Sequence, residues 1–130
     1  MFCIKIFQIG RDLTSTCHLN YNHSLSGVGS ESFFMAKGVG RENLGGWSDV
    51  YILRPEVVES YFYLWRITKE PKYRAWAWEA ALAIEKHCKA RYGYSGLQNA
   101  NSKHPVKDDL QRSFFLAETL KLRGAYDDSL

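Results

Sequence analysis

A helix begins within the stretch Tyr51-Ile52-Leu53-Arg54-Pro55-Glu56-Val57-Val58-Glu59-Ser60. Proline suits the first turn of a helix, because the N–H that it lacks would have no partner there. The residue before a proline is biased away from helical backbone angles, so Arg54 lies at the boundary. We therefore predict that a helix starts at Arg54-Pro55 and that the preceding residues approach it in an extended form.

Two carboxylates and one guanidinium lie within the first turn of this predicted helix. Glu56 is close to the positive end of the helix dipole, which favours a negative charge, and Glu59 follows on the same face. Arg54 adds an opposite charge beside them. An ordinary, well-charged helix start has the same residue types, so composition alone leaves a structural and a functional interpretation open.

Composition and charge limit the classes of function. The chain has 130 residues, 45% of them hydrophobic and 15% aromatic, which is enough for one small folded domain. The net charge is only +3 and the basic residues are scattered, so we expect no nucleic-acid partner. No apolar run is long enough to cross a bilayer, and the first ten residues do not form a signal peptide. The cysteines, Cys3, Cys17 and Cys88, have no zinc-site spacing.

The spacing of apolar residues after Pro55 predicts two helices that form an antiparallel hairpin. Apolar residues recur at intervals of three and four up to Thr68, which places them on one face. A second helix opens at Pro71 and runs to about Lys89, with several alanines that favour helix and close packing. Because the connection between them is short, the two helices pack side by side in opposite directions.

The remaining segments give weaker patterns. Apolar and polar residues alternate imperfectly over Phe2–Ile9, which fits either a short strand or a fraying, interrupted helix. The glycine-, serine- and asparagine-rich segment Asn20–Asp49 is predicted to be a loop with one or two short strands. A connection of that length in a compact domain tends to be functional or to pack against something else.

A third helix is predicted from Leu110 to about Leu122, capped by Asp108 or Asp109. On this helix Phe114 and Glu118 are four residues apart and share one face. A solvated glutamate beside a core phenylalanine is the alternative interpretation of that pair.

Several sequence blocks, in order and with similar spacing, closely resemble the class I α-1,2-mannosidases of glycoside hydrolase family 47, most closely the Golgi-type members. The blocks are Thr16-Cys17-His18, Gly29-Ser30-Glu31-Ser32-Phe33, Tyr51–Glu56, Trp65-Arg66-Ile67-Thr68, Tyr73–Glu79 and Ser113–Lys121. The resemblance covers residues 12–121 as a partial catalytic domain. Residues 1–11 and 122–130 are then a divergent N-terminal segment and a divergent C-terminal tail.

The resemblance implies an all-α fold that is part of an (α/α)7 barrel with short β-hairpins and long loops. It implies a Ca²⁺-dependent, inverting mannosyl-oligosaccharide 1,2-α-mannosidase, a glycosidase that removes terminal α-1,2-linked mannose from high-mannose N-glycans. Family members act in the lumen of the Golgi apparatus or endoplasmic reticulum and are often membrane-anchored.

Residue roles carry over from the family by position. The resemblance implies that Glu56 is the general base and that Arg54 binds substrate. Glu59 and Glu118 match carboxylates around the sugar and the water shell of calcium, and Phe114 matches an aromatic that packs on the sugar ring. Glu56, Glu59 and Glu118 would therefore contact Ca²⁺ through water only. Inverting cleavage uses one carboxylate to activate water and another to protonate the leaving oxygen, and Glu56 suits the first task.

Other family positions have no match in this sequence. The family's general acid lies upstream of the matching segment, and the threonine that ligates calcium directly lies downstream. The family's disulfide partner of Cys17 also lies upstream. We therefore expect an incomplete catalytic domain that is inactive in isolation, or, as the alternative, an inactive truncated isoform or a fragment that binds a glycan or a protein. Helix faces bearing Trp65, Trp76 and Phe115 are expected to be exposed and to drive self-association.

Overall fold

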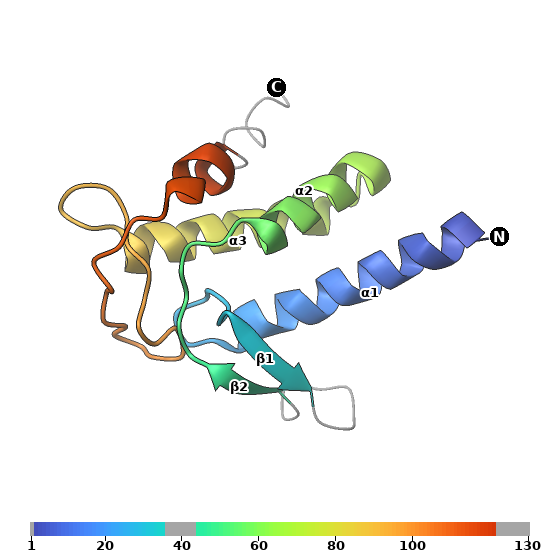
Figure 1. Cartoon of the computed structure of the whole chain (residues 1–130). Coiled ribbons are helices and arrows are strands. Elements are labelled where there is room, and N and C mark those ends of the chain that lie inside the picture. Colours follow the sequence, from blue (N-terminus) through green and yellow to red (C-terminus); the bar gives the residue numbers. More distant parts are fainter. Residues whose placement is uncertain (1, 36–43, 122–130) are drawn as a thin grey trace.

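The computed structural model describes residues 2–35 and 44–121 of the chain. Three long helices run side by side, and a small β-hairpin lies next to the C-terminal end of the first helix (Figure 1). This arrangement confirms the predicted mostly helical fold. The elements are α1 (Phe2–His23), β1 (Ser32–Met35), β2 (Leu44–Ser48), α2 (Glu56–Thr68), α3 (Pro71–Cys88) and the π-helix η2 (Phe115–Thr119).

The helix hairpin agrees with the sequence prediction to within one residue at each end. Pro55 occupies the N-cap position of α2 with helical backbone angles, and its carbonyl accepts the N–H of Glu59 at 2.8 Å. The helix ends at Lys69, which takes a left-handed conformation (φ 59°) and donates its N–H to the carbonyl of Trp65 at 2.8 Å. Pro71 then opens α3. The left-handed Lys69 and the proline at position 71 therefore set the two ends of the turn between α2 and α3.

An aromatic cluster joins the three helices in the core. His18 of α1 stacks on Trp76 of α3, with ring centroids 3.8 Å apart, and its Nδ1 lies 3.1 Å from the hydroxyl of Tyr61 on α2. Tyr61 is fully buried and His18 nearly so. Burial lowers the pKa of His18 to about 4, because the charged imidazolium would lose its hydration there.

Helix α1 corrects the prediction for the N-terminal region. Residues 2–9 belong to a 22-residue helix, so the strand alternative is wrong, and the predicted loop begins only after His23. The helix is held by a face that packs on the core, where Phe7 is half-buried and Thr14, His18 and Tyr21 are buried. Tertiary packing outweighs the imperfect local pattern. Among the described helices, none is long and apolar enough to span a membrane.

The third predicted helix starts later than expected. Helical structure begins at Ser113 and passes into η2, whereas residues 110–112 are irregular. Asp108 accepts the N–H of Leu110 at 2.9 Å through Oδ1, and Asp109 is left-handed (φ 61°). Asp108 therefore stabilises a turn before the helix rather than capping the helix itself. The predicted end near Leu122 lies outside the described residues.

Two expected exposures are also wrong. Trp65 and Phe115 are 7% and 1% exposed, and Trp76 is half-buried, because other parts of the same chain cover these rings. The ring of Phe115, for example, lies 4.9 Å from the ring of Tyr94. The tail at 122–130 and the centre of the long connection, residues 36–43, lie outside the described part of the chain.

Candidate active site

The segment before α2 is tied to two distant parts of the chain. Tyr51 and Leu97 exchange backbone hydrogen bonds of 3.0 Å and 2.7 Å. The hydroxyl of Thr119, on η2, donates to the carbonyl of Leu53 at 2.9 Å, and both residues are buried. Buried polar groups of this kind are costly to leave unpaired, so these bonds fix the backbone just before the helix start.

The backbone conformation of Leu53 changes the direction of the chain just before Arg54. Leu53 is fully buried, yet its backbone has a positive φ of 68°. Residues other than glycine rarely adopt this conformation. The packing of its side chain and the Thr119 bond to its carbonyl hold this turn in place. The next residue, Arg54, is consequently exposed while its neighbours on both sides are buried.

Arg54 bridges two carboxylates at the surface. Its Nε donates to Oε2 of Glu31, and its Nη1 lies 3.3 Å from Oε1 of Glu56. Oε1 of Glu31 also accepts the backbone N–H of Ile52 at 2.9 Å. The hydrogen bond and charge of Glu31 raise the pKa of Arg54 above its usual value, so the guanidinium is charged at every accessible pH. The sequence-predicted pair of Arg54 and Glu56 is thus brought together.

A pocket of about 200 Å³ opens beside this cluster, between α1, the start of β1 and the start of α2. Gly29 forms one wall, and a side chain there would meet the ring of Tyr21 at 2.5 Å, so the close approach requires glycine. The pocket wall combines charged, polar and aromatic groups, as expected of a small-ligand site. Its lining residues include Cys17, Asn20, Tyr21, Ser30, Glu31, Tyr51, Arg54 and Glu56.

The other predicted site residues lie further from the pocket. Glu59 is half-buried, one helical turn after Glu56. Glu118 is exposed on η2, next to the Thr119 hydroxyl that bonds Leu53, so η2 and the start of α2 meet there. Phe114 is half-buried against the core and is not among the residues that line this pocket.

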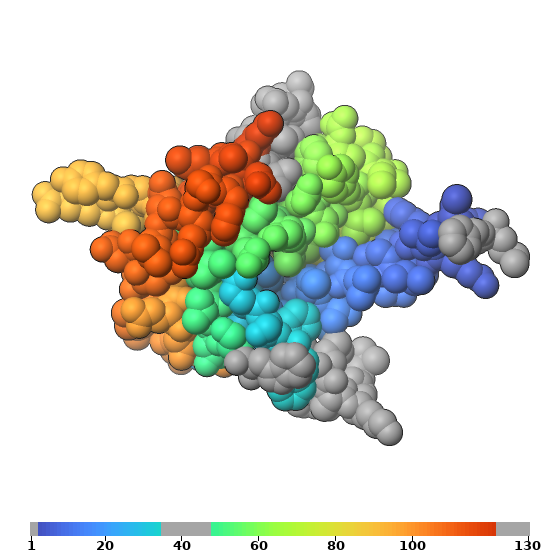
Figure 2. Space-filling view, viewed as in Figure 1, coloured from blue at the N-terminus to red at the C-terminus, as the bar shows by residue number. Residues whose placement is uncertain are grey.

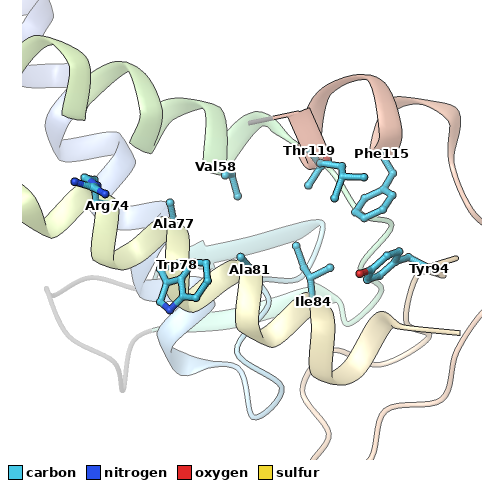
Figure 3. A pocket seen from close by; sticks show the side chains of 10 residues that line it. Val58, Arg74, Ala77, Trp78, Ala81, Ile84, Tyr94, Phe115 and Thr119 are labelled. Carbon is cyan, nitrogen blue, oxygen red and sulfur yellow. The ribbon is translucent and has the colours of Figure 1, made fainter. Parts of the chain in front are cut away.

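A second pocket of about 210 Å³ lies between α2, α3 and η2 (Figure 3). Its wall is largely apolar, and the ring of Phe115 points into it. Phe115 directly follows Phe114, the residue predicted to pack on the sugar ring. Arg74 is the charged residue of the wall. This pocket contains none of the predicted catalytic side chains, so we assign the candidate site to the Arg54 cluster.

The described residues contain no cluster that would ligate calcium directly. No group of three or more histidine, cysteine or acidic side chains in residues 2–35 and 44–121 is placed to hold a metal ion. Glu56, Glu59 and Glu118 therefore do not form a direct calcium site on their own, and their predicted contact with calcium through water stays a prediction. The cysteines Cys3, Cys17 and Cys88 are free thiols, and burial raises the pKa of Cys88 to about 12 and that of Cys17 above its usual value.

Glu31 is the site residue to which the sequence assigned no role. It is the carboxylate of the Gly29–Phe33 block, but its contacts are with Ile52 and Arg54, 21 and 23 residues further along the chain. The available signal was its place in the block Gly29-Ser30-Glu31-Ser32-Phe33, one of those that resemble the family. Backbone pairing brings it to the site, because its N–H donates to the carbonyl of Val50 at 2.9 Å.

Comparison with a solved structure identifies the class of fold. The chain superposes on an α-1,2-mannosidase from Trichoderma reesei with a TM-score of 0.78 and 32% sequence identity, covering 88% of this chain and 26% of that one. A shared backbone over that much of the chain shows that the described fold is part of an (α/α)7 barrel, as the sequence predicted.

The profile of glycosyl hydrolase family 47 matches residues 4–122, and the chain belongs to this family. It is 50% identical over 117 residues to mannosyl-oligosaccharide α-1,2-mannosidase IA of Drosophila melanogaster, covering 90% of this chain and 18% of that protein. It is 48% identical over 114 residues to the human 1,2-α-mannosidase IB, covering 88% of this chain and 18% of that protein. The chain therefore spans about 18% of the length of these curated relatives.

Proposed function

We propose that this chain supplies part of the active site of a mannosyl-oligosaccharide 1,2-α-mannosidase that hydrolyses terminal α-1,2-linked mannose in high-mannose N-glycans. The observation that supports the proposal is the contact between Arg54 and Glu56 at the start of α2, within the segment that matches the family. The proposed chemistry is inverting hydrolysis, which requires a carboxylate base for water and a separate acid for the leaving oxygen.

Glu56 is the proposed base. Its side chain is 58% exposed, so water has access to the carboxylate, and its position one residue after Pro55 is fixed by the start of the helix. Arg54 holds Oε1 of Glu56 and presents guanidinium N–H groups that can donate to sugar hydroxyls. Glu31 restrains Arg54 from the opposite side and thereby orients both groups. Glu59, Glu118 and Phe114 are proposed to complete the sugar-binding wall.

Calcium, the compartment and the Cys17 disulfide are further parts of the proposal and rest on the family resemblance. Since the described carboxylates form no three-residue cluster, we expect the 130-residue chain to bind Ca²⁺ weakly, with a dissociation constant of about 0.1 mM or above. Isothermal titration calorimetry measures this directly, and micromolar binding would contradict it. Residence in the Golgi or endoplasmic reticulum lumen is tested by imaging the tagged protein.

The activity is best tested in a complete domain. We would replace the matching segment of the human 1,2-α-mannosidase IB with residues 4–122 of this chain and measure mannose released from a high-mannose glycan. We expect the chimera to be active and Glu56→Gln to reduce turnover by about 10²–10⁴-fold, because the amide cannot accept a proton from water.

A matched control uses Glu79, an exposed glutamate on α3 that is not among the residues lining the pocket beside Arg54. Glu79→Gln should leave turnover unchanged. If the Glu56→Gln chimera folds like the parent and retains its turnover, Glu56 is not the base. If the parent chimera folds but releases no mannose, the proposed activity of this segment is wrong.

A further inference from the structure

The hydroxyl of Thr119 bonds outside its own helix. Thr119 lies on η2 and donates at 2.9 Å to the carbonyl of Leu53, 66 residues earlier in the chain. Serine and threonine hydroxyls inside a helix commonly bond to the carbonyl four residues earlier instead. The hydroxyls of α1 and α2 do so at 2.7–2.9 Å, namely those of Thr14, Ser15, Thr16, Ser60 and Thr68. In the space-filling view, the segment that carries Thr119 packs on the segment that leads into α2 (Figure 2).

This bond fixes the peptide unit from which the chain enters the candidate site. Leu53 and Thr119 are 0% and 4% exposed, so the described chain itself encloses both partners. The Leu53 carbonyl and the Arg54 N–H belong to one planar peptide unit. Arg54 is restricted because a proline follows it, and Pro55 has a fixed φ. Few free torsions therefore separate the anchored peptide from the backbone of Glu56.

We propose that Thr119 is a positioning residue for Glu56. Its hydroxyl holds the Leu53–Arg54 peptide, and thereby keeps the Glu56 carboxylate at the place where it activates water. The inference rests on the proposed function, in which Glu56 is the base. A displacement of about 1 Å can lower the rate of a catalysed step by about 10²-fold, so the position of a base matters as much as its chemistry.

The same bond links Glu56 to a second predicted site residue. Glu118 directly precedes Thr119 on η2, so the hydroxyl joins the two segments that carry these carboxylates. The N–H of Leu120 bonds to the carbonyl of Phe115, five residues earlier, which is the π-helical pattern. Single π-helical turns are frequent at functional sites.

Loss of the Thr119 hydroxyl should affect turnover more than substrate binding. Arg54, the proposed substrate-binding residue, has a separate restraint, because its Nε donates to Oε2 of Glu31. Glu56 lies 3.3 Å from Nη1 of Arg54 and depends on the backbone for its position. We therefore expect kcat to fall by about tenfold or more while KM changes by less than about threefold.

Substitutions in the chimera that carries residues 4–122 test the proposal. Thr119→Val removes the hydroxyl at nearly constant volume and should lower kcat, whereas Thr119→Ser keeps a hydroxyl and should restore most of it. Thr14→Val is the matched control, since it removes a buried hydroxyl of α1 outside the pocket beside Arg54 and should leave kcat unchanged. If Thr119→Val keeps the parental kcat, or if Thr119→Ser is no better than Thr119→Val, the proposal is wrong.

A double variant tests whether Thr119 acts through Glu56. Once Glu56→Gln has removed the base, adding Thr119→Val should lower kcat little further, because the group that Thr119 positions is already lost. A double variant that is slower than Glu56→Gln by the whole factor of Thr119→Val would show an independent, structural effect and would overturn the proposal.

Amide hydrogen exchange in the 130-residue chain tests the positioning without any activity, and so separates it from the proposed function. The N–H of Glu59 bonds to the carbonyl of Pro55 in the first turn of α2, and the N–H of Lys69 bonds to Trp65 at the other end. Thr119→Val should speed exchange at Glu59 by about tenfold relative to Lys69, and Thr119→Ser should not. Equal changes at both amides would mean that Thr119 does not hold the helix start, whatever the activity of the chimera.

Discussion

The start of α2 and the N-terminal half of α1 differ in where their partners lie. Around Arg54, backbone and side chains are bonded to residues 31, 97 and 119, so distant parts of the same chain hold a short polar segment. In α1, Ile6, Ile9 and Leu13 form an equally regular pattern but remain exposed. A regular pattern therefore identifies a face, whereas only the tertiary contacts show whether the chain itself covers that face.

The largest expected effect is a loss of stability on substitution of a buried residue, compared with substitution of an exposed one. Tyr61→Ala should lower the free energy of unfolding by about 3–5 kcal/mol, because it empties a fully buried site in the aromatic cluster and removes the contact with His18. Ile9→Ala should change it by only about 0.5 kcal/mol or less, since Ile9 is 57% exposed. Urea denaturation of dilute protein measures both, and equal losses would show that the face of α1 that bears Ile9 is covered within one chain.

The next effect is a pH dependence of the covered region. Burial holds the pKa of His18 at about 4, below its usual value of 6.5, so the unfolded chain binds a proton that the folded chain does not between these values. Stability is therefore fully present above pH 6.5 and falls by up to about 3 kcal/mol as the pH drops toward 4.

Unfolding free energies measured between pH 7 and pH 4 test this dependence. His18→Gln should flatten the slope, whereas His23→Gln, at an exposed histidine of the same helix, should leave it as it is. An unchanged slope in His18→Gln would assign the pH dependence to other groups.

Much of the helical framework could be predicted because local and tertiary signals agree. Pro55 and Pro71 mark helix starts through their missing N–H groups, and the apolar spacing between them coincides with the buried face of α2. The third helix was placed too early because Asp108 has the chemistry of a cap but bonds Leu110 within a turn. The role of Glu31 was not predictable, since it depends on residues more than 20 positions away.

A smaller effect tests how η2 is joined to the helix start. Thr119→Val should cost about 1–3 kcal/mol, because it leaves the buried carbonyl of Leu53 without its hydroxyl donor. Thr119→Ser keeps the hydroxyl and should recover most of the loss. If the serine variant is no more stable than the valine variant, the hydrogen bond contributes little and the packing of the methyl group accounts for the cost.

The smallest expected effect isolates the charge of Glu31. Glu31→Gln retains an oxygen for the N–H of Ile52 but removes the charge that faces Arg54, whose side chain is 51% exposed. Because solvent screens a half-exposed ion pair, the loss should be about 1 kcal/mol or less at low salt. At 1 M salt the Debye length falls to about 3 Å, so wild type and Glu31→Gln should become nearly equal in unfolding free energy. Glu31→Ala, which also leaves the Ile52 N–H without its acceptor, should remain less stable at both salt concentrations. A difference between wild type and Glu31→Gln that is unchanged by salt would mean that Glu31 acts through shape and hydrogen bonding alone, and that its charge does not hold Arg54 in place.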